Sequence, residues 1–290
     1  MSLDTADLIL ATVAGTGVGF ISGLFGVGGG FLLVPTLSLG LNLPVQVIVG
    51  SAACQVLGPA TASLLARRLQ PAHFRLPLCL GGGLLAGIIA GARILEAAQA
   101  RGTVTINAQN VPAAELLVLA VYLMLLTSIG LFAVWETCVR HGEAPSPLLA
   151  RLSLPPLGDF PGFSGRTVSI PVLAWFGLAV GFLSGLLGIS GGLVLIPGLI
   201  YLLGMQTQDT VRAATVIVFM VALQSTVVHG WHGNIDLALV AALLAGGTAG
   251  ARVGAQIGTK LASRKLRRYF GGLLLLAAGM VAVRLVILCR

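Results

Sequence analysis

The residues most able to do chemistry in this chain are two glycine-rich motifs of one pattern. Phe20–Pro35 reads FISGLFGVGGGFLLVP and Phe182–Pro197 reads FLSGLLGISGGLVLIP, at a constant offset of 162 residues. Glycine lets main chain approach a ligand with no side chain between them, and a helix that begins there presents unpaired N–H groups. Those groups and the positive end of the helix dipole favour an anion. The motifs therefore predict an anion site built from main chain.

Each motif places three small residues directly before a short apolar run, and we predict that they bind the anion: Gly28, Gly29, Gly30, Ser190, Gly191 and Gly192. The alternative is that these residues only permit tight turns or close helix packing. The binding interpretation is favoured because the cluster occurs twice, each time before an apolar run that ends in Pro35 or Pro197. Ser190 is the one departure, and its hydroxyl could cap the helix or contact the ligand.

Polar side chains in the long apolar segments are further candidates for contact with the ligand. Ser51 and Thr215 lie at equivalent positions of the two motif-bearing halves, and Gln55 and Gln224 lie in the same segments. Hydroxyls in membrane helices often bond their own backbone, and amides often bond a neighbouring helix, so structural roles are the alternative.

The two halves match in a second stretch of sequence, and each copy of it ends in an arginine. The sequence AGAR ends at Arg93 and again at Arg252. A guanidinium fits an oxyanion, and an ionisable residue in a membrane segment warrants a functional hypothesis. The alternative is that each side chain only reaches the lipid headgroups from the end of its helix.

The composition is that of an integral membrane protein. Of 290 residues 57% are hydrophobic and 9% are charged, whereas soluble domains carry about 25% charged residues. The net charge of +8 is attributed to cytoplasmic loops and not to nucleic-acid binding, which we do not expect. The four cysteines lack metal-ligand spacing, and no P-loop, HExxH or GxSxG motif occurs. We therefore expect no metal, no cofactor and no enzymatic activity.

Five apolar segments can be drawn in each half of the chain. They lie near 8–24, 31–41, 45–66, 76–95 and 113–134 in the first half, and near 172–187, 193–203, 211–228, 237–257 and 270–288 in the second. Crossing the hydrocarbon takes about 20 helical residues, so the last three of each set are long enough. The first two are short and separated by the glycine cluster. They form either a hairpin that enters part-way or two short spans.

Basic residues predict how the segments are oriented. Positive loops face the cytoplasm, and they follow the third segment of the first half (Arg67, Arg68, Arg75) but the fourth segment of the second (Lys260, Arg264, Lys265, Arg267, Arg268). The loop 229–236, which corresponds to the first of these, has no Lys or Arg. The halves are therefore expected to have inverted topology, with both termini outside.

The predicted fold class is an all-α integral membrane protein of two inverted-topology repeats, each with a Gly-broken helical pair followed by three long transmembrane helices. The first repeat covers 1–140, a Pro- and Gly-rich cytoplasmic connector covers 141–170, and the second repeat covers 171–290. Two glycine ladders at four-residue spacing are interpreted as helix packing: Gly83, Gly87, Gly91 and Gly246, Gly250, Gly254, Gly258.

The loop 229–236 also contains His229, Trp231 and His232. We expect them to anchor the chain at the membrane interface. A metal site is less favoured, because two histidines three residues apart lack further nearby ligands.

The doubled motif resembles the TauE/SafE sulfite exporter family. Its first copy is G-x-G-G-G-x-x-x-x-P, Gly26–Pro35, and in the second copy Ser190 replaces the glycine at Gly28. The resemblance covers nearly the whole chain and implies transport of sulfite, organosulfonates, thiosulfate or related sulfur-containing anions. It does not name the ligand.

Inverted repeats with interrupted helices are a recurrent plan of secondary transporters. We therefore predict a multi-pass transporter of the cytoplasmic membrane that moves a small anion by alternating access, with the bilayer as its other partner. The alternatives are an anion channel, a membrane assembly protein and, less favoured, an integral membrane enzyme. The sequence leaves open the substrate, the direction, the coupling ion and the oligomeric state.

Overall fold

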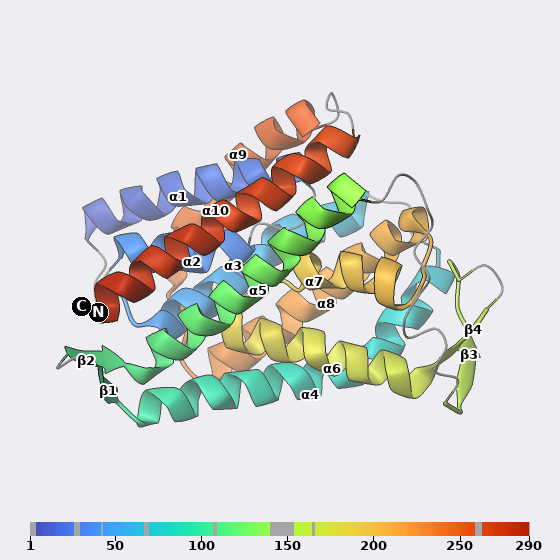
Figure 1. The fold of residues 1–290 in the computed structure, drawn as a ribbon, viewed down its shortest axis with the longest axis horizontal. Helices are drawn as coiled ribbons and strands as arrows, with labels where there is room; N and C mark the ends of the chain where they lie inside the picture. The colour runs from blue at the N-terminus through green and yellow to red at the C-terminus, as the bar shows by residue number, and fades with distance from the viewer. Residues whose placement is uncertain are drawn as a thin grey trace.

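A computed structural model describes residues 4–25, 30–41, 43–66, 70–106, 109–139, 154–163, 166–258 and 263–289. Within these ranges the chain is a bundle of helices (Figure 1). Among the described residues, eight helices are long and apolar enough to cross a membrane. They are α1 (Thr5–Phe25), α3 (Val45–Ala66), α4 (Ala72–Ala100), α5 (Ala113–Val139), α6 (Ile170–Leu187), α8 (Thr207–Trp231), α9 (Leu237–Gly258) and α10 (Ser263–Cys289).

Only the second helix of each broken pair is short. These helices are α2 (Gly30–Gly40) and α7 (Gly192–Pro197), the latter continued by a π-helical segment, η2 (Gly198–Leu202). At 1.5 Å per residue, eleven residues rise about 16 Å, roughly half of the hydrocarbon thickness. The expectation that both members of each pair are short was wrong for α1 and α6. Polar residues lengthen α1 at its start, where Asp7 lies in the first turn and favours the positive helix end.

Two small β-hairpins lie between the long helices. β1 (Thr103–Ile106) pairs with β2 (Gln109–Pro112), and β3 (Leu157–Asp159) pairs with β4 (Thr167–Ser169), both antiparallel. The second hairpin lies in the predicted connector, of which residues 140–153 fall outside the described ranges. Helical structure was thus correctly predicted for the membrane segments, while the connections also contain strands.

The helices of the two halves pack against one another. α1 packs along α9, and α4 packs along α6, while α3 packs on α8 and α5 on α10. In the sequence repeat α1 corresponds to α6 and α4 to α9, so the first two pairs are equivalent. Each long-helix pair therefore takes one helix from each half, and the core is continuous between the halves.

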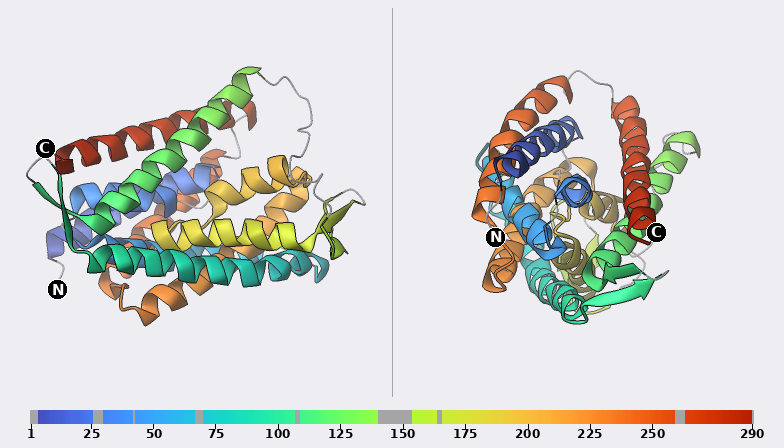
Figure 2. Two further views of the ribbon diagram at one scale, coloured as in Figure 1. Left: turned by 60° about the horizontal axis from the view of Figure 1, so that its bottom comes forward. Right: turned by 90° about the vertical axis from the view of Figure 1, so that its left-hand side faces the viewer.

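The connections divide between the two ends of the bundle. Hairpin β1–β2 lies at the same end as the beginning and end of the described chain, and hairpin β3–β4 lies at the other end (Figures 1 and 2). The starts of α4 and α10 lie towards the same end of the bundle as β3–β4 (Figure 1). The basic residues 264–268 belong to the first turns of α10 and not, as expected, to a loop before it. Helices α5 and α10 run in opposite directions along the bundle (Figure 1).

Candidate functional site

The second glycine motif breaks the chain between α6 and α7. Gly188 ends α6 with φ +68°, and Gly191 precedes α7 with φ +74°, both in the left-handed region that favours glycine. Residues 188–192 are buried. Ser190 is only 4% exposed, and it is not the N-cap of α7, because Gly191 holds that position without a side-chain cap. The capping role considered for Ser190 was therefore wrong.

The first motif meets the second. Gly28 and Gly29 lie outside the described residues, but Gly30 begins α2 and is buried. A Cβ added to Gly30 would lie 3.4 Å from the main-chain nitrogen of Ser190 and 3.5 Å from the carbonyl oxygen of Gly188. The start of α2 is thus in direct contact with the second break. We call the contact of Gly30 with Gly188–Gly192 the junction.

The junction offers main-chain donors to a ligand. The carbonyl oxygen of Gly191 accepts hydrogen bonds from the N–H groups of Val194 and Leu195. The N–H groups of Gly192 and Leu193 come before the first of these helical hydrogen bonds of α7. Oriented N–H groups in a low dielectric bind an anion more strongly than they would in water. The described residues of the junction include no acidic side chain that would repel an anion.

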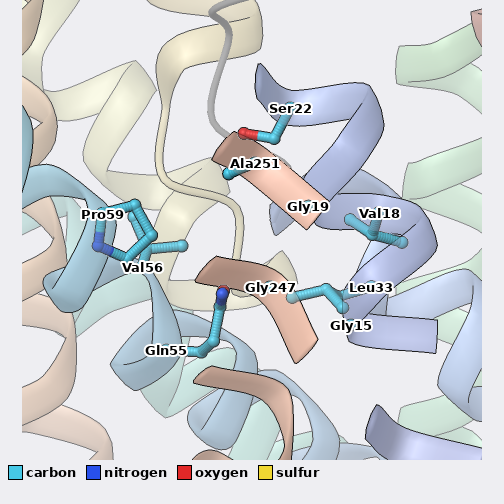
Figure 3. Close-up of a pocket in the computed structure, with 10 residues that line it drawn as sticks. All are labelled: Gly15, Val18, Gly19, Ser22, Leu33, Gln55, Val56, Pro59, Gly247 and Ala251. Atoms are coloured by element: carbon cyan, nitrogen blue, oxygen red, sulfur yellow. The ribbon is translucent and has the colours of Figure 1, made fainter. Parts of the chain in front are cut away.

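A cavity of about 20 Å³ lies beside the junction, between α1, α2, α3 and α9. It is lined by Gly15, Val18, Gly19, Ser22, Leu33, Gln55, Val56, Pro59, Gly247 and Ala251 (Figure 3). Val56 connects it to the junction, because its Cγ2 would lie 3.3 Å from a Cβ on Gly30. This volume suffices for about one water molecule. A three-oxygen anion would require the surrounding helices to separate.

The glycine ladders hold these helices in close contact, as predicted. A Cβ on Gly250 of α9 would lie 2.0 Å from the carbonyl oxygen of Thr16 on α1, and a Cβ on Gly91 of α4 would lie 2.3 Å from that of Phe182 on α6. The sequence reasoning did not find the partner ladders, which are Gly15, Gly19 and Gly23 on α1 and Gly177, Gly181 and Gly185 on α6. Their four-residue spacing was the available signal.

Of the predicted polar contacts, Gln55 lies in the cavity. It is 7% exposed, and its amide extends towards Gly247 (Figure 3), where a Cβ would lie only 2.7 Å from its Nε2. Gln224, on α8, donates to the carbonyl of Gly81 on α4 at 3.5 Å. It does not line the cavity that contains Gln55.

The predicted hydroxyls are held by main chain. Ser51 is fully buried and accepts a hydrogen bond from the N–H of Asp236 at 3.0 Å. Thr215 donates to the carbonyl of Val211 one turn earlier, at 2.9 Å. In this conformation both side chains have structural partners.

Arg93 and Arg252 are exposed on the outside of α4 and α9. The residue before Arg252, Ala251, lines the cavity, but Arg252 itself does not. Their positions fit side chains that extend to the headgroups.

The structure adds residues that sequence reasoning missed. Ser22, Pro59 and Gly247 line the cavity, and only Gly247 had a signal, since it neighbours the ladder residue Gly246. His229 was expected in an exposed loop but is fully buried in the last turns of α8. Trp231, two residues later, is 85% exposed, as an interfacial anchor would be. Within the described residues no group of three His, Cys, Asp or Glu is placed to hold a metal ion.

Comparison with known proteins gives one match. The family model described as sulfite exporter TauE/SafE matches residues 11–281. No curated protein and no solved structure matches the chain.

Proposed function

Because the chain belongs to the sulfite exporter TauE/SafE family over residues 11–281, and is thus a multi-pass membrane transporter and not an enzyme, we propose that it carries a small sulfur-containing anion bound at the junction. The observation that carries this proposal is the contact between the two broken motifs, where Gly30 meets the main chain of Gly188 and Ser190. The ligand would be sulfite, thiosulfate or an organosulfonate, whose oxygens accept hydrogen bonds from main-chain N–H groups.

The environment of the junction supports an oxyanion over a cation. The described lining of the neighbouring cavity contains a serine and an amide but no ionisable side chain. A cation would meet few oxygen ligands there, whereas an anion would meet N–H groups and the Gln55 amide. The small cavity favours a compact head group and excludes a bulky one unless the helices move.

An inverted arrangement of the two repeats, 1–140 and 171–290, supplies the means of alternating access in this proposal. Two observations support it: α1–α9 and α6–α4 are equivalent pairs, and α5 and α10 run in opposite directions (Figure 1). Rocking of one repeat against the other would then expose the junction to each side in turn. We place 141–170 and the basic starts of α4 and α10 in the cytoplasm. The position of β3–β4 and of these helix starts towards one end of the bundle supports this placement (Figure 1).

Accessibility labelling tests this topology. In a background without cysteines, Arg68→Cys and Lys265→Cys should react with an impermeant maleimide from the cytoplasm, and Asn234→Cys should react from outside. Labelling of all three from one side would overturn the inverted arrangement.

Transport by purified protein in liposomes tests the binding site. Uptake of sulfite, sulfate, thiosulfate, sulfoacetate and taurine should identify the preferred anion. Gly30→Ala should then lower its uptake about tenfold or more, because the added methyl displaces a ligand from main-chain donors, and a hydrogen bond to a charged group contributes about 1.5 kcal/mol.

Gly82→Ala is the matched control. It lies in α4, and a Cβ there would meet nothing within 4 Å. Its uptake should equal that of the wild type. A folded Gly30→Ala protein that transports as well as Gly82→Ala would place the ligand elsewhere.

A further inference from the structure

A stripe of side chains on α8 leads from the junction to one end of the bundle. Val221, Ser225, His229 and His232 follow at intervals of three and four residues and therefore share a helix face. Val221 lies at the junction, since its Cγ2 would be 4.0 Å from a Cβ on Gly191. At the other end His232 forms an ion pair with Glu96 of α4, 3.2 Å between Nε2 and Oε1.

Two polar residues of this stripe, Ser225 and His229, are buried and unpartnered. Both are 0% exposed, and neither ring nitrogen of His229 nor the Ser225 hydroxyl has a hydrogen-bond partner in the described part of the chain. The same is true of the hydroxyl of Ser184 on α6. The main chain of Gly185 faces the imidazole but does not satisfy it with good hydrogen-bond geometry.

The ordinary structural role does not account for these groups. Other hydroxyls of the same bundle, such as Thr61, Thr215 and Thr226, donate to the carbonyl four residues earlier. Ser225 does not. Buried polar groups without partners cost folding free energy, so a stripe of them calls for a functional explanation. Histidine in a membrane segment is a recurrent proton carrier.

Few other charges face the imidazole. Helices α6 and α7 carry no ionisable side chain. Helix α3 offers only Cys54, which lies beside Thr226, and η2 offers only Tyr201, which bonds Glu136. Helix α4 offers Glu96, held by His232, and the exposed Arg93, while its other ionisable groups, His73, Arg75 and Cys79, lie in its first third. On α8 itself, Asp209 and Arg212 pair with each other in its first two turns.

We propose that His229 is the proton-binding residue that couples proton movement to anion movement, with the Glu96–His232 pair as its route to the aqueous phase. This inference rests on the proposed function. A protonated His229 would be a buried cation without a counter-ion, and an anion in the junction would be a buried anion without one. Bound together, each lowers the cost of the other. The carrier would therefore load a proton and an anion on the same side and release both on the other.

The distance permits this coupling. Gly185, which faces the ring, precedes Gly188 by three residues, and Val221 precedes His229 by eight, or about 12 Å of helix rise. At about 12 Å and an effective dielectric near 20, one unit charge changes the affinity for another roughly tenfold. By linkage, the anion must raise the affinity for the proton by the same factor.

Liposomes with an imposed pH gradient provide the test. The probes are labelled thiosulfate and sulfoacetate, which stay ionised where histidine changes charge, between about pH 5 and 8. With the outside acidic, the wild type should accumulate the probe inside, and its affinity for the probe should rise by up to about tenfold as the pH is lowered. His229→Gln should bind the probe with an affinity independent of pH and should lose gradient-driven accumulation.

His73→Gln is the matched control, because His73 lies in the first turn of α4, outside the stripe. It should behave as the wild type. If the wild type transports the probe at equal pH but an imposed pH gradient does not drive accumulation, the coupling alone is overturned, whether or not His229→Gln folds. A folded His229→Gln protein with the wild-type pH profile would overturn the role of His229. If the wild type moves neither anion at equal pH, the proposed function fails for these anions and the coupling falls with it.

Discussion

Two helix crossings share their glycine-mediated packing but differ in the side chains around them. In each, the first helix of one half packs along the fourth helix of the other. At the α1–α9 crossing and at the α4–α6 crossing, ladders of glycine bring carbonyls and Cα atoms into contact. At the α1–α9 crossing a cavity also opens next to the junction. The common scaffold therefore does not by itself make a binding site.

The difference lies in three side chains. Following the offsets of the repeat, Gln55, Pro59 and Gly247 of the α1–α9 crossing correspond to Phe219, Leu223 and Ile88 of the α4–α6 crossing. Ile88 is fully buried, whereas Gly247 has no side chain and faces the amide of Gln55. The two crossings thus share their glycine ladders, whereas the side chains at these three positions differ in size and polarity. If the anion binds at the junction, the comparison predicts that the α1–α9 side contributes more to the site.

The largest effect should come from the ladders themselves. Gly250→Ala and its counterpart Gly91→Ala both press a methyl against a carbonyl oxygen, so each should lower the free energy of unfolding by about 3 kcal/mol, the upper range for overpacked sites. Thermal unfolding in detergent measures this, with Gly272→Ala as control because its Cβ meets nothing. Unequal losses at the two crossings would contradict the equivalence of the scaffold.

Making the α1–α9 crossing resemble the α4–α6 crossing should remove the cavity beside the junction. Gly247→Ile introduces the residue of the other half and points it at Nε2 of Gln55. Overpacking there should cost about 1–3 kcal/mol of stability. In the protein that folds, the isoleucine would occupy the cavity, so anion uptake should fall strongly.

The reverse change tests the other crossing. Ile88→Ala opens the filled crossing, and it should cost about 2–5 kcal/mol of stability without raising uptake. Uptake that survives Gly247→Ile in a folded protein would show that the cavity is not on the anion path.

Gln55 provides a finer test. Gln55→Leu keeps the volume but removes the amide, and it should weaken anion affinity about tenfold, the worth of one hydrogen bond to a charged group, about 1.5 kcal/mol. Gln224→Leu is the comparison, since Gln224 lies outside the cavity lining. It should leave the affinity unchanged. Equal losses in both variants would remove the distinction between the crossings.

Much of this fold could be predicted from sequence because its signals are local. Apolar length identified the long helices α3, α4, α5, α8, α9 and α10, and glycine spacing identified the packing faces. The full length of α1 was missed because polar residues before its apolar run continue the helix. That of α6 was missed because the helix already begins at Ile170 and Pro171. Which ladder faces which could not be predicted, since pairing across halves depends on tertiary packing.

The site was less predictable than the fold. The glycine motifs indicated the breaks, and Gln55 was singled out as a membrane amide, but nothing local distinguished it from Gln224. His229 was placed in a loop because α8 continues past its apolar run into Gly230 and Trp231. Burial of a polar residue at the end of a helix is decided by its neighbours, here Gly185 of α6, and not by its own segment.

The smallest effects should come from the two arginines, which the sequence singled out and the structure places on the outer surface. If Arg93 and Arg252 only reach the headgroups, Arg93→Gln and Arg252→Gln should each change anion affinity less than about twofold, as exposed substitutions change free energies by about 0.5 kcal/mol or less. Thiosulfate and sulfoacetate binding to the folded variants measures this. A loss of tenfold or more in either, only partly restored by Lys, would mean that a guanidinium turns inward to form a bidentate contact with the anion in another state of the transport cycle. The two residues occupy equivalent positions of the repeat. A loss of affinity in Arg252→Gln alone would mean that the two crossings also differ in their arginines, whereas equal losses would mean that both halves contribute an arginine to anion binding.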